Sequence, residues 1–487
     1  MKVTGIKIVC GLLAYVSMSV QSSATDKKNS APNIIFILAD DLGIGDLGCY
    51  GQKVIKTPNV DKLAAQGIRF TNHYSGSTVC APSRSVLMTG QHSGRTVIRD
   101  NKGVKTQEGQ TAMDANSVTI AEVLKQKGYA TGAFGKWGLG FIGTSGDPNK
   151  QGFDEFFGYN CQSIAHRFYP EYLWHNDKKV YLPGNDWTNT VTYAADVIHH
   201  KAIEFIEKNA DKPFFLYYPT TIPHAELIVP EDEIFKRHSG KYKETPFTIE
   251  KAKNGAAYGP GIDIAAYCTN NQPKATYAAM VERLDKHVGE VMAKLVELGL
   301  DKNTLIMFSS DNGVHSEGGL DPEDFDSNSI YRGHKRDMYE GGIKTPMLAM
   351  WPAKIKAGST TNHISAFWDV LPTLAEVAKC KTPDNIDGIS MAPTLLSGKK
   401  QKVHDYLYWE FHAMNGKQAV RQGKWKAVRL NVLKKDITVT ELYNLDEDPS
   451  ETKNLAAQYP DKVKELQVIM DKSHTESELF PFYSGIK

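Results

Sequence analysis

Hydrophobic runs along the chain end repeatedly at clusters of polar residues. The run Asn33–Leu38 is almost wholly apolar, which is typical of a strand buried on both faces of a parallel sheet. It stops just before Asp40 and Asp41. Three more runs predict strands that end close to polar side chains: Tyr129–Phe134 before Lys136, Pro213–Tyr218 before His224, and Thr304–Ser309 before Asp311 and Asn312.

Segments with helical periodicity lie between these strands. Apolar residues recur at helical spacing in Val60–Gln66, in Ser117–Lys127 with Ser117 as the N-cap, in Tyr193–Asn209 and in Ala275–Leu298. Helices that alternate with buried strands predict an α/β fold, with a large, mostly parallel or mixed sheet flanked by helices. In such sheets the ligand crevice lies at the carboxyl ends of the strands, so we expect the polar clusters to meet there.

The pattern changes after residue 385. Polar turns separate three predicted short strands, and one helix follows them: Asp405–Phe411, Gln418–Val420, Lys424–Arg429 and the helix Pro460–Ser473. These elements predict a small antiparallel sheet with a helix. We therefore divide the mature chain into a domain over residues 25–385 and a subdomain over residues 386–487. The segment Gly240–Gln272 has weak periodicity and is interpreted as a long surface insertion.

The first residues have the features of a secretory signal peptide. Lys2 and Lys7 precede the apolar stretch Ile8–Val20, and small residues follow up to Ala24. An uncleaved membrane anchor is the alternative, but an apolar stretch of about 13 residues is too short to cross a bilayer. We therefore predict a signal peptide over residues 1–24, cleavage after Ala24, and a secreted or periplasmic protein without membrane attachment.

Composition narrows the functional classes. The 487 residues are 41% hydrophobic and 23% charged, as in soluble globular enzymes, and the formal net charge is +1. Since no bulk charge attracts nucleic acid or an anionic membrane, binding of an anion requires a local site. Cleavage would remove one of the 6 cysteines and leave an odd number. At least one thiol is then free or modified, and the pairing of the others stays open.

The segment from Cys80 to Gly90 carries the most specific chemistry. It reads Cys-Ala-Pro-Ser-Arg-Ser-Val-Leu-Met-Thr-Gly and resembles the sulfatase signature C-x-P-S-R-x-x-L-x-T-G at every specified position. The resemblance implies sulfuric ester hydrolysis, an alkaline-phosphatase-like fold, and oxidation of Cys80 to Cα-formylglycine by a formylglycine-generating enzyme. It also implies a geminal diol. One hydroxyl of the diol attacks sulfur and the other later expels the sulfate, so that covalent catalysis divides one difficult step into two.

The sulfatase resemblance extends over nearly the whole mature chain and implies a metal site. The positions that match the ligands of the family are Asp40, Asp41, Asp311 and Asn312, with Cys80 as a further ligand once modified. Carboxylate and amide oxygens suit a hard divalent cation. We predict one Ca²⁺ per chain, because its large coordination shell accepts several protein ligands, and Mg²⁺ is the alternative. Taken alone, the two acidic pairs could instead be turn residues.

Basic residues of the chain match catalytic positions of the family: Arg84, Lys136, His224 and Lys335. The resemblance implies that Arg84 holds the diol and the ligand carboxylates, and that Lys136 and Lys335 bind sulfate. We assign proton removal from the nucleophile to Asp311, and neutralisation or protonation of the leaving oxygen to Lys335 and His224. Outside this context each lysine would be interpreted as a solvated surface residue.

One position departs from the family. Sulfatases usually read Gly-Lys-Trp-His-Leu-Gly, with the histidine assisting sulfate elimination, and this chain has Gly138 in its place. His166 is the preferred substitute, because it follows the predicted strand Phe156–Tyr159 near the expected crevice. A solvated loop histidine is the alternative interpretation of His166, and Gln162 and Ser163 are weaker candidates for the pocket.

The C-terminal subdomain also resembles that of sulfatases. Its residues Glu410, His412 and Arg421 could bind sugar hydroxyls or form structural ion pairs. Export and the overall resemblance favour a sulfated carbohydrate, attacked exo at a terminal or near-terminal residue. Two other functions stay open. A phosphohydrolase of the same superfamily would use serine, threonine or a zinc pair with histidine ligands, and a non-catalytic glycan-binding protein would keep Cys80 unmodified.

Overall fold

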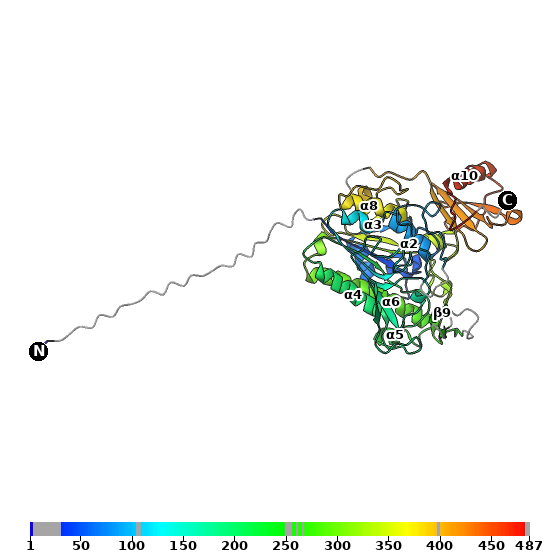
Figure 1. Cartoon of the computed structure of the whole chain (residues 1–487). Helices are drawn as coiled ribbons and strands as arrows, with labels where there is room; N and C mark the ends of the chain where they lie inside the picture. Colours follow the sequence, from blue (N-terminus) through cyan, green and yellow to red (C-terminus); the bar gives the residue numbers. More distant parts are fainter. Residues whose placement is uncertain are drawn as a thin grey trace. The chain divides into compact units, whose positions relative to one another are not determined.

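A ten-stranded mixed sheet lies at the centre of the fold (Figure 1). The computed structural model describes residues 1–2, 31–103, 109–248, 256–259, 262–264, 267–396 and 400–482, and its helices and strands all belong to the compact unit Pro32–Lys487. In spatial order the strands of the sheet are β13 (Ser359–Thr361), β2 (Ile68–Phe70), β12 (Met347–Met350), β11 (Thr304–Ser310), β1 (Asn33–Ala39), β8 (Phe214–Pro219), β4 (Ala130–Lys136), β5 (Glu155–Tyr159), β6 (Tyr172–His175) and β7 (Lys178–Tyr181).

The central strands of this sheet run parallel, from β11 through β1, β8 and β4 to β5. β1 pairs with β11 and β8, and every residue of β1 is buried. The prediction of a fully buried parallel strand at Asn33–Leu38 is therefore confirmed. Because these strands are parallel, the residues that follow them meet at one edge of the sheet.

Helices cover both faces of the sheet (Figure 1). One layer contains α1 (Pro58–Gln66), α4 (Ala194–Lys208), α5 (Glu233–His238) and α6 (Pro273–Glu297). The other contains α2 (Cys80–Thr89), α3 (Ile120–Lys125) and α8 (Val370–Val377). Ile35 and Ile37 of β1 pack in the core of the first layer, whereas Phe36 packs edge-on against Phe367. Successive side chains of β1 thus pack against the two helical layers in turn. The predicted α/β fold is confirmed.

The start of α3 differs from the sequence prediction. Thr119 is the N-cap: its hydroxyl accepts a hydrogen bond from Glu122 N at 3.2 Å, and the Glu122 carboxylate accepts one from Thr119 N at 2.8 Å. The predicted cap, Ser117, lies before the helix, where its N–H donates to Asp114 O. That prediction was wrong because the glutamate three residues after Thr119 completes a capping box, which Ser117 lacks.

A second, four-stranded antiparallel sheet follows the first sheet along the chain. Its strands in order are β15 (Leu407–Phe411), β16 (Lys417–Gln422), β17 (Trp425–Leu430) and β18 (Val439–Asn444). Leu466 and Met470 of α10 (Pro460–Ser473) pack against this sheet. The small sheet and its helix are confirmed, and β18 is a strand that the sequence did not predict. The division of the chain at residue 385 stays a prediction.

Shorter elements complete the described chain: α7 (Glu340–Ile343), α9 (Ala392–Leu396), the paired strands β3 (His73–Tyr74) and β14 (Ser365–Ala366), and the paired strands β9 (Ala256–Gly259) and β10 (Ile262–Ile264). β9 and β10 belong to the predicted insertion Gly240–Gln272, part of which is outside the described residues. The predicted signal peptide is also outside them, apart from Met1 and Lys2.

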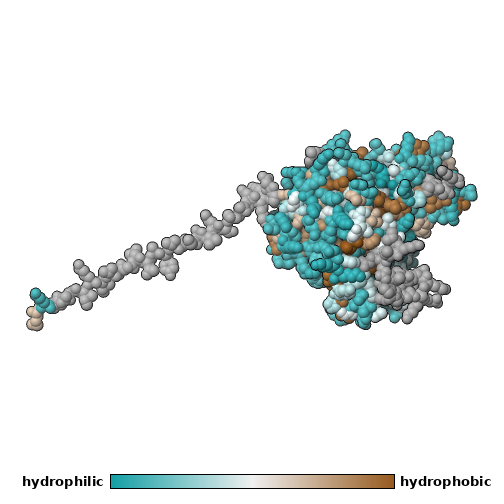
Figure 2. All heavy atoms as spheres, in the orientation of Figure 1, coloured by the Kyte–Doolittle hydropathy of each residue, from teal (hydrophilic) through white to brown (hydrophobic). Residues whose placement is uncertain are grey.

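The described surface is mostly hydrophilic on the face shown in Figure 2, with hydrophobic residues scattered over it. Within the described ranges, no helix combines the length and the apolar character needed to cross a bilayer. The cysteines that the structure describes are Cys49, Cys80, Cys161, Cys268 and Cys380, and all are free thiols. None of the pairings that the sequence left open is therefore formed.

Candidate active site

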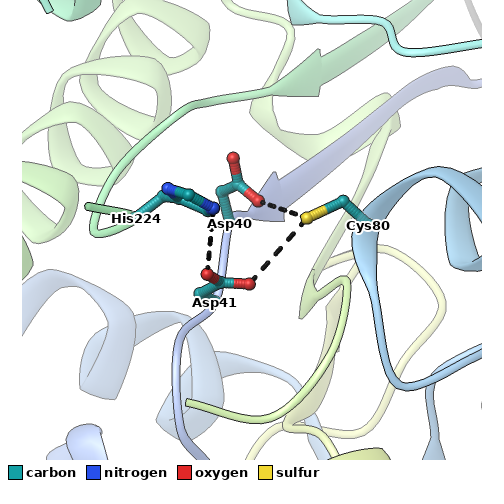
Figure 3. Close-up of side chains that lie close together, drawn as sticks. All are labelled: Asp40, Asp41, Cys80 and His224. Atoms are coloured by element: carbon teal, nitrogen blue, oxygen red, sulfur yellow. Dashed lines mark hydrogen bonds and ion pairs between the residues drawn. The ribbon is translucent and has the colours of Figure 1, made fainter. Parts of the chain in front are cut away.

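Polar residues that follow the parallel strands meet at one edge of the sheet. They are Asp40 and Asp41 after β1, Asp311 and Asn312 after β11, Lys136 at the end of β4, His224 in the loop after β8, and Cys80 at the start of α2. All of them are buried. The side chains of Asp40, Asp41, Cys80 and His224 converge in Figure 3, and their candidate ligand atoms lie within 4.8 Å of one another.

Cys80 lies directly beside the acidic pair. Its Sγ atom is 3.5 Å from Asp40 Oδ1 and 4.0 Å from Asp41 Oδ1. Burial raises the pKa of the Cys80 thiol well above its usual range, and the carboxylates of Asp311 and Asp40 raise it further against the opposing effect of Lys136. The cysteine is therefore held as a neutral thiol, which is a poor nucleophile.

Arg84 connects the acidic residues on the two neighbouring strands. Its Nε and one terminal nitrogen donate to Asp311 Oδ2 at 3.0 and 2.7 Å, and the same terminal nitrogen lies 3.3 Å from Asp40 Oδ1. The other terminal nitrogen donates to the backbone carbonyl of Lys136. Arg84 lies four residues after Cys80 in α2, so the two side chains share one face of the helix.

Two lysines compensate the remaining carboxylate charge. Lys136 Nζ donates to Asp40 Oδ2 at 2.9 Å, and Lys335 Nζ donates to Asp41 Oδ2 at 2.7 Å. Burial opposes ionisation of Asp40, but Lys136 and the other cations nearby hold its pKa well below the usual range. Burial likewise lowers the pKa of Lys335, but Asp41 and further acidic groups bring it well above the ordinary value. These shifts favour the charged forms of Asp40 and Lys335.

The oxygen atoms of this cluster fit a hard divalent cation. Asp41 has a left-handed backbone with φ of 63°, and its N–H donates to Asp311 Oδ1 at 3.1 Å. Among the described residues, Asn312 Oδ1 is buried without a hydrogen-bond partner, while Asn312 Nδ2 lies 2.6 Å from Asp41 Oδ1. The two amide positions can be exchanged by a flip of the side chain, which would bring Asn312 Oδ1 beside that carboxylate. Carboxylates with an amide oxygen form the donor set that Ca²⁺ or Mg²⁺ binds.

His224 and His166 form a stack at the edge of this cluster. His224 Nε2 lies 3.2 Å from Asp41 Oδ2 and 2.9 Å from Lys335 Nζ. The ring of His166 stacks on His224 with centroids 4.7 Å apart and an interplanar angle of 13°. Burial lowers the pKa of both imidazoles well below the usual value, and the adjacent Lys335 adds to this effect at His224. The structure thus brings His166 to the site as a neighbour of His224.

The space next to Gly138 is filled by Gln162. Gly138 has a φ of +76°, and a Cβ atom at this position would lie only 2.0 Å from Gln162 Nε2. A side chain at position 138 would strain the left-handed backbone and would have to displace the amide of Gln162. Of the pocket candidates named from the sequence, Gln162 therefore takes the position next to Gly138, whereas His166 contacts His224.

Glu317 is a site residue that the sequence reasoning missed. Its carboxylate accepts a hydrogen bond from Lys335 Nζ at 3.3 Å and another from Arg336. Lys335 is therefore held between Asp41 and Glu317. The nearness of Glu317 to the Asp311-Asn312 pair in the sequence was the signal that could have identified it.

The C-terminal candidates lie in buried networks. Glu410 accepts a hydrogen bond from Arg99 at 3.1 Å, and its carboxylate lies 2.9 Å from His412 Nε2 and 2.8 Å from His474 Nδ1. Arg421 donates to the hydroxyl of Tyr74. These contacts give Glu410 and Arg421 structural roles as ion-pair and hydrogen-bond partners, which is one of the two interpretations that the sequence allowed.

Comparison with known proteins agrees with this geometry. A family model described as Sulfatase matches residues 32–380, and one described as N-sulphoglucosamine sulphohydrolase, C-terminal, matches residues 332–477. The chain is 29% identical to N-acetylgalactosamine-6-O-sulfatase of Bacteroides thetaiotaomicron, over 95% of this chain and 97% of that protein. It is 33% identical to human arylsulfatase A, over 81% and 74% of the two chains.

Solved structures show the same similarity. Ps i-CgsB superposes with a TM-score of 0.75 at 28% identity, covering 91% of this chain and 92% of that one. The family model spans most of the chain, and relatives and structures match along nearly its full length. The chain therefore belongs to the sulfatase family of the alkaline-phosphatase-like superfamily, and it is a sulfuric ester hydrolase.

Proposed function

We propose that this sulfatase removes sulfate from a sulfated carbohydrate, acting exo, with Cys80 converted to Cα-formylglycine and one Ca²⁺ as the metal. The observation that carries the proposal is the position of Cys80. Its side chain points at Asp40 and Asp41 within a buried cluster that also contains Lys136 and Lys335. A nucleophile at residue 80 would therefore meet the sulfate between paired cations.

Relatives support the substrate class. Two similar proteins of Bacteroides thetaiotaomicron are named N-acetylgalactosamine-6-O-sulfatase and N-acetylglucosamine-6-O-sulfatase, at 29% and 27% identity. Ps i-CgsB, at 28% identity, is known in complex with k-i-k-neocarrahexaose. Each of these proteins is named for a sugar or was solved with one, and the matches cover 91–96% of this chain. Human arylsulfatase A and rat steryl-sulfatase match 81% and 82% of it, so the matches of greater length favour a sulfated sugar as the substrate.

The side chains of the site divide the work of ester cleavage. Hydrated formylglycine would supply two hydroxyls on one carbon, one for attack on sulfur and one for expulsion of the sulfate by elimination. Lys136 and Lys335 would offset the charge of the sulfate oxygens, while Arg84 keeps Asp311 and Asp40 in place. Asp311 would accept the proton of the attacking hydroxyl.

The leaving oxygen has two candidate proton donors or charge partners. Lys335 Nζ and His224 Nε2 lie 2.9 Å apart, so both can reach one oxygen atom of the departing group. Protonation or charge neutralisation of an alkoxide by such groups contributes ~10²–10⁴-fold to a rate. This pair would therefore decide how well a poor leaving group such as a sugar hydroxyl departs.

A divalent cation would be held by Asp40, Asp41, Asp311 and Asn312, with residue 80 as a further ligand. When bound, it would polarise sulfate oxygens and lower the pKa of a hydroxyl at residue 80. Ca²⁺ is proposed over Mg²⁺ because several protein oxygens and a bidentate sulfate suit its larger coordination shell. We also propose that the protein is exported, with cleavage near Ala24, and that a formylglycine-generating enzyme acts on the Cys80 signature.

The test is sulfate release by the purified, exported protein. We expect release from members of a panel of 2-O, 3-O, 4-O, 6-O and N-sulfated sugars, no comparable phosphate release from the matching phosphate esters, and loss of turnover in Cys80→Ala with an unchanged unfolding midpoint. Greater phosphate release would establish the phosphohydrolase instead. Sugar binding without turnover, together with an unmodified thiol, would establish the glycan-binding protein.

A further inference from the structure

Two buried glutamines at the strand edge have amide atoms without hydrogen-bond partners. Gln162 is 6% exposed and Gln110 is 2% exposed, and Gln162 N donates to Gln110 Oε1 at 3.3 Å. Within the part of the chain that the structure describes, Oε1 and Nε2 of Gln162 and Nε2 of Gln110 have no partner. Two donor groups and one acceptor are therefore buried and unsatisfied at neighbouring positions.

The topology places these amides next to the sulfate-binding side chains. Lys136 ends β4 and pairs with Tyr159, which ends β5, so the residues after both strands lie side by side. Gly138 N donates to Asn160 O at 3.0 Å. Gln162 follows shortly after, and its Nε2 occupies the space that a Cβ atom at position 138 would require. The amide of Gln162 thus lies at the edge of the sheet where Lys136 binds Asp40.

An amide that is buried without hydrogen bonds destabilises the folded protein. A methionine side chain has nearly the same length and would fill the same space without this disadvantage. Unsatisfied polar groups in a native structure call for an explanation, and active sites are where such groups gather. A ligand that supplies the missing partners accounts for Gln162 and Gln110 together.

We propose that the amides of Gln162 and Gln110 form a neutral oxygen-binding subsite for the substrate, beside the sulfate ester. The inference rests on the proposed hydrolysis of a sulfated sugar at this site. The two NH2 groups can donate to sulfate oxygens or to sugar hydroxyls, and Gln162 Oε1 can accept a hydrogen bond from a hydroxyl. Because the amides carry no charge, they add hydrogen bonds to those of Lys136 and Lys335 without changing the charge of the site.

The experiment compares Gln162→Met with the unsubstituted full-length mature enzyme. We expect kcat/KM to fall by about tenfold or more, since one or two hydrogen bonds to the substrate are lost. The unfolding midpoint is expected to stay the same or rise, because the Gln162 amide has no hydrogen-bond partner among the described residues and the variant gains an apolar side chain. A residue with only a structural role would lower the midpoint instead.

Gln418→Met is the matched control. Gln418 is also fully buried, but its Nε2 donates to the Tyr408 hydroxyl at 2.7 Å and its Oε1 accepts from Arg429 at 3.0 Å. This substitution is expected to lower the midpoint while activity per folded molecule is retained. The two methionine variants thus separate a substrate-binding amide from a structural one.

Substrate choice identifies the bound oxygen. If kcat/KM of Gln162→Met falls for aryl sulfates as well as for sugar sulfates, and inorganic sulfate inhibits the variant more weakly, the amides bind the sulfate group. If kcat/KM falls for sugar sulfates alone, the amides bind hydroxyl groups of the sugar. Unchanged kcat/KM for all substrates in Gln162→Met would overturn the proposal.

The design keeps this result separate from the proposed function. If the unsubstituted enzyme releases no sulfate from any ester, the proposed function fails. The subsite is then judged by the rise in unfolding midpoint that inorganic sulfate or a sulfated sugar produces. A smaller rise in Gln162→Met than in the unsubstituted protein supports the subsite, and equal rises refute it.

Discussion

The guanidinium of Arg84 donates two hydrogen bonds to one oxygen of Asp311, at 3.0 and 2.7 Å. Both residues are fully buried, and the same guanidinium reaches Asp40 on the neighbouring strand. Arginine can make this set of contacts because its planar fork carries several donors in fixed directions. The position of the carboxylates beneath residue 80 therefore depends on the shape of residue 84 as well as on its charge.

Arg84→Lys is expected to keep the charge of the site and lose its geometry. We expect kcat/KM to fall by ~10²-fold, comparable to the loss of a preorganised donor in other active sites. Arg84→Ala should also lower the free energy of unfolding by about 3–5 kcal/mol, since it leaves buried carboxylates uncompensated. Kinetics and denaturant unfolding measure the two effects.

Arg283→Lys is a suitable control for Arg84→Lys. Arg283 is buried and donates to Asp196 at 3.0 and 2.7 Å, away from Cys80. This variant should lose stability and keep its activity per folded molecule. Equal kcat/KM for Arg84→Lys and the unsubstituted enzyme would show that the guanidinium geometry of Arg84 is not needed to position the carboxylates.

Removal of the metal is expected to lower both activity and stability. A cation that binds only the folded protein stabilises it by RT ln(1 + L/Kd), where L is the free cation concentration, so its unfolding midpoint rises with that concentration. Chelation should therefore lower the midpoint, and added Ca²⁺ should restore it more effectively than Mg²⁺. Asn312→Ala is expected to weaken Ca²⁺ binding by at least about tenfold. Calorimetric titration with Ca²⁺ measures this directly, and identical affinities in the two proteins would remove Asn312 from the ligand set.

The two stacked histidines should differ in importance. His224 contacts both Lys335 and Asp41, whereas the ring contact of His166 is with His224 and Tyr267. We expect His224→Ala to lower kcat by ~10²–10⁴-fold, as for loss of a group that acts on the leaving oxygen, and His166→Ala to have a smaller effect. Steady-state kinetics with a sugar sulfate tests the order. Full activity in His166→Ala would exclude that residue from the mechanism.

His73 is expected to make the fold sensitive to acid. Burial lowers its pKa to about 3, and a nearby histidine adds to the effect. In the unfolded chain its pKa is ~6.5, so below that pH the unfolded state binds the proton more strongly than the folded state. Stability contributed by the neutral imidazole is present above pH ~6.5 and is lost as the pH falls toward about 3, by ~1.4 kcal/mol per pH unit.

His73→Gln isolates this effect. Glutamine can still bond Ser365, to which His73 Nδ1 lies at 2.9 Å, but it does not titrate. The free energy of unfolding of the variant, measured by denaturant titration between pH 7 and pH 4, should fall less steeply than that of the unsubstituted protein. Parallel curves would show that His73 does not control acid stability.

The parallel strands and the residues after them were predictable because both follow from local pattern. An apolar run such as Asn33–Leu38 predicts a buried strand, and parallel strands bring their carboxyl ends together. The signature at Cys80 indicated the sulfatase family, which the family model confirms. What the sequence could not give was the contact of Gln162 with Gly138, since those positions lie on the ends of different strands.

One further difference has the same physical origin, and another has a local one. The partners of Glu410 include Arg99 and His474, which come from distant parts of the chain, so a pattern within the C-terminal strands did not indicate a buried network. The N-cap at Thr119 was missed for a local reason, because Ser117 is an equally good cap by type and only Glu122 decides between the two.

The most direct test of the account is the state of residue 80 in the active enzyme. Protein made with and without a formylglycine-generating enzyme would be digested, and the fraction of the peptide that carries an aldehyde in place of the Cys80 thiol measured by mass spectrometry. We predict that specific sulfatase activity rises in proportion to that fraction and vanishes with it. Full sulfate release from protein that carries only the thiol would contradict the central claim.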